Sequence, residues 1–182
     1  MAGWPAYAVS MATLVIIRHA KSDWSVPVTD RDRPLAKRGR KQARETGRWL
    51  AEHVRPLDLA VVSVAARTRQ TWELVREALA GEVETRLAEE AYTFNARELL
   101  ELVTELPPST TTVALVSHNP AVEGLVERLT GEWVPLTTSA VAVVELSDWA
   151  SAGLGDGRLT AAGRPADDTW HVSREHRSSG GR

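Results

Sequence analysis

This sequence contains short runs of apolar, mostly β-branched residues, each of which stops abruptly at a basic or polar side chain. The first run, residues 14–17, leads directly into Arg18 and His19. Another run, residues 113–116, is followed shortly afterwards by His118. Continuous apolar runs of this length, bounded by turn signals, are typical of strands that are buried on both faces. The sequence therefore predicts buried strands that carry guanidinium and imidazole groups at their carboxyl ends.

Segments with helical spacing separate these strands. Apolar and small residues recur at intervals of three and four, which predicts helices at residues 35–53, 66–80, 96–106 and 120–130. Strands are expected at residues 12–18, 57–63, 82–86, 111–117, 138–146 and 157–162. Asn119 is expected to cap the last helix and Gly131 to end it. Because strands and helices alternate, we predict a three-layer α/β/α fold with a mostly parallel central sheet.

The carboxyl ends of parallel strands meet at one edge of a sheet, where open α/β proteins bind their ligands. Arg67 follows a predicted strand within a few residues, so we expect four groups to converge there: Arg18, His19, Arg67 and His118. Neutral imidazole is a competent nucleophile toward phosphorus, and guanidinium groups bind phosphoryl oxygens. His118, if protonated, adds a further donor, and the amides at the start of the helix at 120–130 add positive potential. The set predicts a phosphate site.

The length of the chain fits one domain. Of its 182 residues, 43% are hydrophobic and 25% are charged, as in ordinary globular proteins. We place a single domain at residues 12–162. Residues 1–11 are predicted to be a disordered or non-native arm, with Met11 as an alternative start of translation. Residues 163–182 are polar and lack periodicity, which predicts a largely disordered tail.

Composition excludes several function classes. The net charge of −2 provides no general attraction to nucleic acid or to anionic membranes. Cysteine is absent, which rules out disulfides, thiolate metal sites and cysteine nucleophiles. No apolar stretch approaches the ~20 residues that span a bilayer. These features are compatible with a reducing compartment, and we predict a cytoplasmic location without nucleic-acid or membrane partners.

Four ordered motifs resemble those of the histidine phosphatase superfamily, which has the phosphoglycerate mutase-like fold. The motifs are Leu-Val-Ile-Ile-Arg-His-Ala-Lys-Ser-Asp-Trp (14–24), Asp-Arg-Pro-Leu (32–35) with Arg-Gly (38–39), Ser-Val-Ala-Ala-Arg-Thr-Arg-Gln-Thr (63–71) and Val-Ser-His-Asn-Pro (116–120). The resemblance covers residues 12 to 146. The short length and the Ser-His-Asn-Pro form are most similar to the small SixA-type phosphohistidine phosphatases. Ala20 and Ser117 depart from the family, which more often has glycine there.

The resemblance implies roles for particular residues. His19 would be phosphorylated transiently, and the phosphate would be held by Arg18, Arg67 and His118. Members of the superfamily usually also carry a carboxylic general acid between the two motifs that here contain Arg67 and His118. Glu90 is the preferred candidate for that acid and Glu89 the alternative, whereas both would otherwise be ordinary solvated glutamates.

The predicted function is that of a metal-independent phosphatase that needs no cofactor and works through a phosphohistidine. Its substrate would be a phosphorylated protein, such as a histidine-containing phosphotransfer domain, or a small phosphorylated metabolite. A metal hydrolase with His19, His118 and Glu90 as ligands is an alternative, which two neighbouring arginines disfavour. A non-catalytic module that binds phosphorylated partners is the other alternative.

Overall fold

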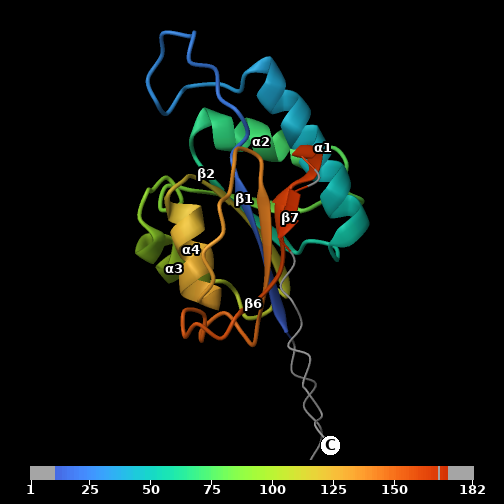
Figure 1. Ribbon diagram of the computed structural model, residues 1–182, viewed down its shortest axis with the longest axis vertical. Coiled ribbons are helices and arrows are strands. Elements are labelled where there is room, and N and C mark those ends of the chain that lie inside the picture. Colours follow the sequence, from blue (N-terminus) through green and yellow to red (C-terminus); the bar gives the residue numbers. More distant parts are fainter. Residues whose placement is uncertain (1–10, 168, 172–182) are drawn as a thin grey trace, which may run out of the picture.

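The computed structural model describes residues 11–167 and 169–171. A single seven-stranded sheet forms the centre of the molecule (Figure 1). The strands are β1 (Ala12–Arg18), β2 (Leu59–Ser63), β3 (Glu84–Ala88), β4 (Thr112–Ser117), β5 (Val141–Leu146), β6 (Arg158–Arg164) and β7 (Thr169–His171). The helices are α1 (Lys37–His53), α2 (Ala66–Arg76), α3 (Ala96–Thr104) and α4 (Ala121–Thr130), with a short 3₁₀ turn at Pro165–Asp167.

The strand order places β1 at the centre of the sheet. The order is β3-β2-β4-β1-β5-β6-β7. β3, β2, β4 and β1 are parallel neighbours, whereas β5, β6 and β7 each run antiparallel to the strand before them in that order. β6 therefore points the same way as β1, and the sheet is mostly parallel in strand direction. β1 and β4 lie side by side in parallel, so their carboxyl ends meet.

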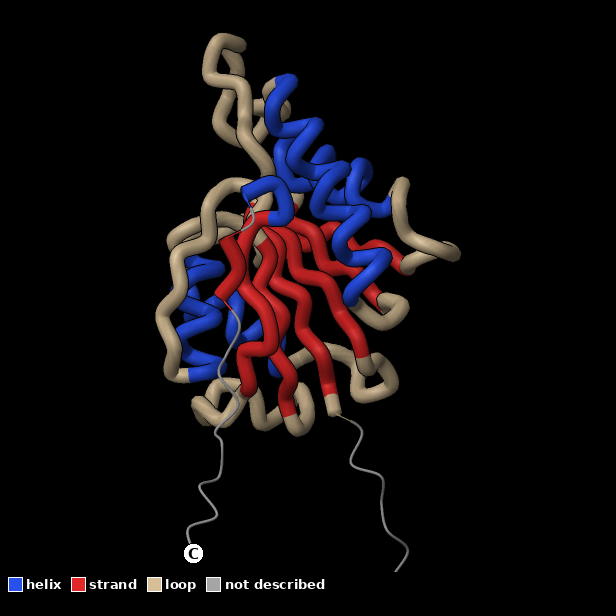
Figure 2. Tube along the Cα trace, turned by 45° about the vertical axis from the view of Figure 1, so that its right-hand side comes forward, coloured by secondary structure: helices blue, strands red, loops and turns tan. Residues whose placement is uncertain are grey.

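Helices cover both faces of the sheet, as Figure 2 shows. Leu14 and Ile16 of β1 pack in one core with α3 and α4, whereas Val15 and Ile17 pack in a second core with α1 and α2. Successive strand side chains point to opposite faces, so a strand covered on both faces has to be apolar at every position. This explains the uninterrupted apolar run, and it confirms the predicted three-layer α/β/α architecture.

Most predicted elements are present, with ends that differ by a few residues. α1 begins at Lys37 instead of residue 35, α2 is regular only to Arg76, and β3 lies at Glu84–Ala88 instead of 82–86. Gly131 ends α4 in the left-handed conformation, with φ of 73°, as predicted. No helix in the described part of the chain is long and apolar enough to cross a membrane.

The C-terminal segment needs a correction. Within residues 163–182, predicted as a disordered tail, β6 continues to Arg164 and β7 adds a short edge strand. Trp170 of β7 stacks on Trp49 of α1 with ring centroids 4.5 Å apart. Backbone pairing with β6 and this stacking contact leave no periodic pattern in the sequence. The predictions for residues 1–10 and 172–182 lie outside the described residues.

Candidate active site

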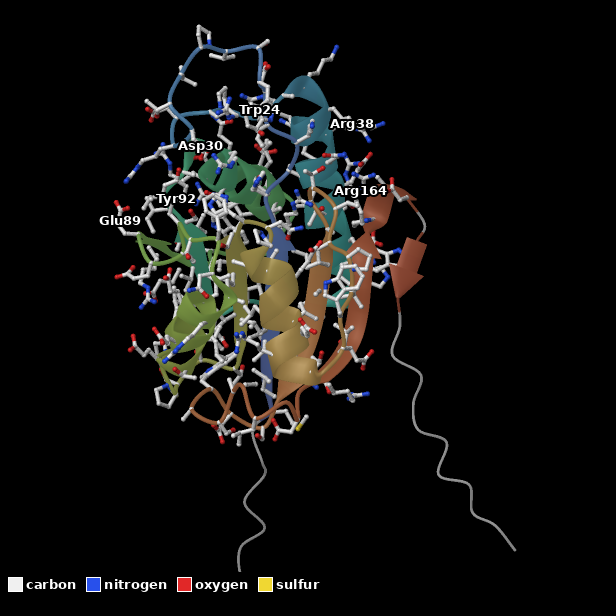
Figure 3. The ribbon with its side chains drawn as sticks, turned by 60° about the vertical axis from the view of Figure 1, so that its left-hand side comes forward. Trp24, Asp30, Arg38, Glu89, Tyr92 and Arg164 are labelled. Atoms are coloured by element: carbon white, nitrogen blue, oxygen red, sulfur yellow. The ribbon has the colours of Figure 1, made fainter. Side chains whose placement is uncertain are left out.

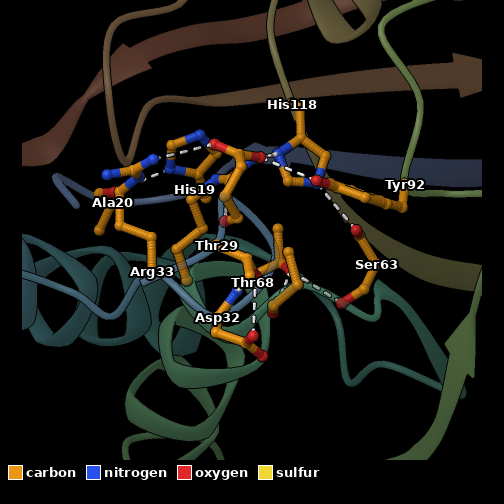
Figure 4. A network of polar contacts seen from close by, with 12 residues as sticks. His19, Ala20, Thr29, Asp32, Arg33, Ser63, Thr68, Tyr92 and His118 are labelled. Atoms are coloured by element: carbon orange, nitrogen blue, oxygen red, sulfur yellow. Dashed lines mark hydrogen bonds and ion pairs between the residues drawn. The ribbon is translucent and has the colours of Figure 1, made fainter. Parts of the chain in front are cut away.

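His19 and His118 come together because they follow parallel neighbouring strands. Arg18 at the end of β1 is in register with Ser117 at the end of β4, and the amide of His19 donates to the carbonyl of Ser117 at 3.1 Å. The two imidazole ring centroids are 5.2 Å apart. Figure 4 shows both rings in one polar network with Ser63 and Tyr92. The structure thus joins side chains that are about a hundred positions apart in the sequence.

The hydrogen bond of His19 leaves one ring nitrogen available. Its Nδ1 lies 2.8 Å from the carbonyl oxygen of Ala20, and a carbonyl only accepts, so Nδ1 carries the proton. Nε2 is then the nitrogen with the free electron pair. Burial is the largest cause that lowers the pKa of His19 to about 4; the hydrogen bond to Ala20 opposes it, and the charges of Arg67 and Arg18 add to the lowering. His19 is therefore neutral at pH 7, as a nucleophile must be.

His118 is fully buried and its tautomer is fixed by its partners. Nη2 of Arg67 can only donate, and it lies 3.2 Å from Nδ1, so Nδ1 accepts and Nε2 carries the proton. Nε2 then donates to Oγ of Ser63 at 2.8 Å. Burial, followed by the charges of His19 and Arg67, lowers the pKa of His118 to about 3. His118 is therefore neutral at pH 7 in this arrangement, unlike the protonated donor that the sequence suggested.

The two arginines reach the site from different elements. Arg18 is the last residue of β1 and donates from Nη1 to the carbonyl of Leu136 at 2.7 Å. Its buried Nε has no partner within the described part of the chain. Arg67 lies in the first turn of α2 and is only 4% exposed. The predicted four-residue set is therefore assembled at one edge of the sheet.

A carboxylate that sequence reasoning did not select completes this cluster. The backbone carbonyl of Asp30 accepts from Nη1 of Arg67 at 2.6 Å, and its Oδ2 accepts from Nη2 at 3.0 Å. The hydroxyl of Tyr92 donates to the same Oδ2 at 2.8 Å. Asp30 belongs to the irregular segment between β1 and α1, which the sequence analysis treated only as a polar connection. An acidic residue just before the Asp-Arg-Pro-Leu motif was the only signal available.

The start of α4 differs from the prediction. Asn119 makes no capping bond; its Nδ2 donates to Oε1 of Glu123 at 2.7 Å and to the carbonyl of Leu136 at 3.1 Å. These two bonds hold the side-chain amide through Nδ2, and Oδ1, the atom that would cap the helix, has no partner in the described part of the chain. Glu123 also acts electrostatically on Arg18, which it stabilises in the charged form. The positive potential expected at this helix terminus is therefore partly balanced by an acidic side chain.

The predicted general acids lie apart from the two histidines. Glu89 is exposed and pairs with Arg31 at 2.5 Å, and Figure 3 shows it at the periphery of the molecule. Glu90 lines a separate hollow beside β3 and α3, together with Glu98 and Glu101. Neither glutamate is among the charges that shift the pKa values of the two histidines, whereas Asp30 acts on both. The structure thus brings Asp30, and not Glu89 or Glu90, to the site.

The ligand set of the metal-hydrolase alternative is not assembled. Among the described residues, no three histidine or acidic side chains are grouped so that they could hold a metal ion. His19 and His118 are neighbours, but Glu90 is directed elsewhere. The geometry instead combines a free imidazole nitrogen with fixed cationic donors. Groups of this kind, at the carboxyl edge of a mostly parallel sheet, are typical of the class of proteins that bind and transfer phosphoryl groups.

Comparisons with known proteins agree with this class. Residues 14–93 match the profile of the histidine phosphatase superfamily (branch 1). An uncharacterized protein of Mycobacterium tuberculosis is 33% identical over 109 residues, 60% of this chain and 66% of that protein. The match thus spans just under two thirds of that relative. The chain belongs to the histidine phosphatase superfamily.

Solved structures indicate which members of the superfamily this chain resembles. The protein named phosphohistidine phosphatase SixA from Agrobacterium tumefaciens superposes with a TM-score of 0.74 at 28% identity, covering 85% of this chain and 98% of that chain. The protein histidine phosphatase SixA complexed with tungstate superposes with a TM-score of 0.68 at 27% identity, covering 85% of this chain and 97% of that chain. Both likenesses extend over most of the fold described above, and within the superfamily the chain is of the SixA type.

Proposed function

We propose that this chain is a metal-independent phosphatase in which Nε2 of His19 takes the phosphoryl group from the substrate. The observation that carries the proposal is the free electron pair on Nε2, fixed by the hydrogen bond from Nδ1 to Ala20. A neutral imidazole held in this way is preorganised for attack on phosphorus. Arg18 and Arg67 would stabilise the charge on the phosphoryl oxygens.

The reaction then proceeds in two displacements. In the first, the bond between phosphorus and the leaving atom breaks, its electron pair stays with the leaving group, and phosphorus bonds to Nε2 of His19. In the second, water attacks phosphorus, the electron pair of the P–N bond returns to Nε2, and the water releases a proton to solvent. The ring of His118 would also contact the phosphoryl group, because its centroid lies 5.2 Å from the ring centroid of His19.

The substrate we propose is a phosphohistidine on a protein, such as a histidine-containing phosphotransfer domain. The names of the two SixA structures support this choice. A small phosphorylated metabolite is the second candidate, because the phosphate-binding groups alone do not discriminate between the two. A cytoplasmic location is proposed with this function and is compatible with the absence of cysteine.

The phosphoenzyme is the test of this proposal. With a labelled phosphoryl donor, the wild-type protein should acquire an acid-labile, base-stable label, and His19→Ala should acquire none and lose turnover. His53→Ala, which removes an exposed histidine outside the site, is the matched control and should be labelled like wild type. Label retained by His19→Ala would refute the nucleophile. Loss of turnover on treatment with a chelator would favour a metal hydrolase, and binding without turnover would favour a binding module.

A further inference from the structure

The Asp30 carboxylate has no part in the two displacements, yet it lies at the centre of the site. It contacts Arg67 at 3.0 Å and the hydroxyl of Tyr92 at 2.8 Å, and Arg33 approaches its other oxygen at 3.5 Å. Its side chain is 46% exposed, whereas Arg67 beneath it is 5% exposed. Asp30 thus occupies the solvent-facing side of the cluster, from which a substrate must approach.

The surroundings of Asp30 keep it ionised. Burial alone would raise its pKa, but the hydrogen bond from Tyr92 and the charge and hydrogen bond of Arg67 outweigh burial, and the pKa lies below its usual value. An ionised carboxylate accepts hydrogen bonds and attracts cations, and it has no proton to give. Asp30 is therefore unsuited to protonate a departing alkoxide at neutral pH.

Aromatic rings line the same side of the site. The ring of Tyr92 lies 5.3 Å from that of His118, and the ring of Phe94 lies 5.7 Å from it. Phe94 is 56% exposed, an unusual environment for a phenyl ring. A planar group that enters beside these rings can stack on them, and a cation over an aromatic face gains further attraction. The carboxylate and the rings together fit a planar, positively charged, N–H-bearing group.

We propose that Asp30 is a specificity-determining residue that selects phosphoryl groups carried on the nitrogen of a planar cation, such as imidazolium, over phosphate esters. This inference rests on the proposed function, since it concerns the leaving group of the same reaction. In substrates of this class the phosphorylated ring carries its proton on the other nitrogen. That N–H is a donor for the Asp30 carboxylate, and the positive charge of the ring is attracted to it.

The first displacement then needs no proton transfer. Nε2 of His19 bonds to phosphorus, the P–N bond of the substrate breaks, and its electron pair neutralises the substrate ring, which leaves as neutral imidazole. The positive charge passes to the ring of His19, whose Nδ1–H is held by Ala20. An ester would instead release an oxyanion next to an ionised carboxylate and away from Glu89 and Glu90. Asp30 thus favours the nitrogen leaving group and disfavours the oxygen one.

The test compares kcat/KM for two small substrates, Nε2-phosphohistidine and phenyl phosphate. Asp30→Asn keeps the size of the side chain and the backbone carbonyl that binds Arg67, and it replaces the charged carboxylate by a neutral amide with a single acceptor oxygen. We expect it to lower kcat/KM for phosphohistidine about tenfold, the usual scale for one charge-assisted hydrogen bond, and to leave phenyl phosphate unchanged or improved. Asp32→Asn is the control, because it makes the same charge change in the same segment at a residue that contacts Thr29 and not Arg67. It should leave the ratio of the two kcat/KM values, phosphohistidine over phenyl phosphate, unchanged.

The outcomes separate this inference from the proposed function. Equal losses for both substrates in Asp30→Asn would reduce Asp30 to a residue that positions Arg67 and would overturn the selectivity. Wild-type protein that turns over neither substrate would contradict the proposed function itself. If Asp30→Asn does not fold, Tyr92→Phe is the second variant, because it removes one hydrogen bond to the Asp30 carboxylate. It should lower the ratio of kcat/KM for phosphohistidine to that for phenyl phosphate about threefold. An unchanged ratio would also overturn the selectivity.

Discussion

Ser139 is the residue that holds the backbone of the nucleophile in place. Its amide donates to the carbonyls of both Arg18 and His19, each at 3.1 Å. Its φ of 63° lies in the left-handed region, which is uncommon for a residue other than glycine. Thr46 of α1 supports this conformation: its Oγ1 lies 2.9 Å from the carbonyl oxygen of Ser139 and 2.9 Å from its Oγ. Thr46 and Ser139 are both fully buried, and their contacts tie the end of β1 to α1.

Replacing Thr46 tests this support. Thr46→Val removes the hydroxyl, which leaves the buried carbonyl of Ser139 without its donor and the buried hydroxyl of Ser139 without its partner, and this should lower the free energy of unfolding by about 1–3 kcal/mol. Because the backbone of His19 depends on Ser139, the rate of phosphoenzyme formation should fall about tenfold as well. Urea unfolding and single-turnover labelling measure the two effects. Thr46→Ser keeps the hydroxyl and should restore both, and a rate that is unchanged in Thr46→Val would contradict the positioning role.

The sequence identifies residues whose position depends on a regular element, and it misses the others. His19 and His118 could be placed together because each directly follows a strand and the strands were expected to be parallel. Asp30 and Ser139 lie in irregular segments, where no helical or strand periodicity predicts to which side a side chain points. Glu90 was selected because the resemblance implies a carboxylic acid in the stretch between two motifs, but its side chain lines a different hollow.

At the scale of elements, a glycine sets the distance between α1 and α2. Gly47 is buried in α1, and a Cβ at this position would lie 2.4 Å from the carbonyl oxygen of Val75 in α2. The two helices therefore pack backbone against backbone at this point. That contact also locates Arg67, which projects from the same helix as Val75.

Gly47→Ala should consequently destabilise the protein. Alanine gains about 1 kcal/mol in helix propensity, but α1 and α2 must separate to accommodate the methyl group, and overpacking of this kind costs about 1–3 kcal/mol. We expect a net loss in the free energy of unfolding, measured by urea denaturation. Arg48→Ala, on the exposed face of the same helix, is the control and should change it by less than about 0.5 kcal/mol. A more stable Gly47→Ala protein would show that the helices are not in close contact.

Helices and strands with a clear hydrophobic periodicity were predictable from the sequence, whereas strands that depend on backbone pairing were not. The three layers and the parallel half of the sheet were predicted from two patterns. These are the apolar runs of β1, β2 and β4 and the apolar stripes of α1 to α4. The antiparallel half depends on β5 turning back beside β1, which the order of elements does not reveal. β7 is the extreme case, since it has three residues, pairs with the edge of β6 and stacks Trp170 on Trp49.

At the scale of the whole molecule, folding places two neutral imidazoles beside the charge of Arg67. His19 and His118 have pKa values of about 4 and about 3 in the folded protein, against about 6.5 in an unfolded chain. The folded state thus binds fewer protons than the unfolded state when the pH falls below about 6.5. Stability is then fully present above pH 6.5 and is lost progressively as the pH falls toward 4.

The free energy of unfolding should therefore decrease between pH 7 and pH 5, by about 1–2 kcal/mol for each of the two histidines, when measured by urea denaturation. Carboxylates with lowered pKa values, such as Asp58, which accepts hydrogen bonds from the amides of Thr111 and Thr112, act only at lower pH. His19→Gln removes one of the two depressed groups, so its decrease should be about half as steep. A wild-type stability that is flat or rises on acidification would mean that both rings bind protons in the folded protein. Such a protein would have no free electron pair on Nε2 of His19 at pH 5, and phosphoenzyme formation would stop over the same range.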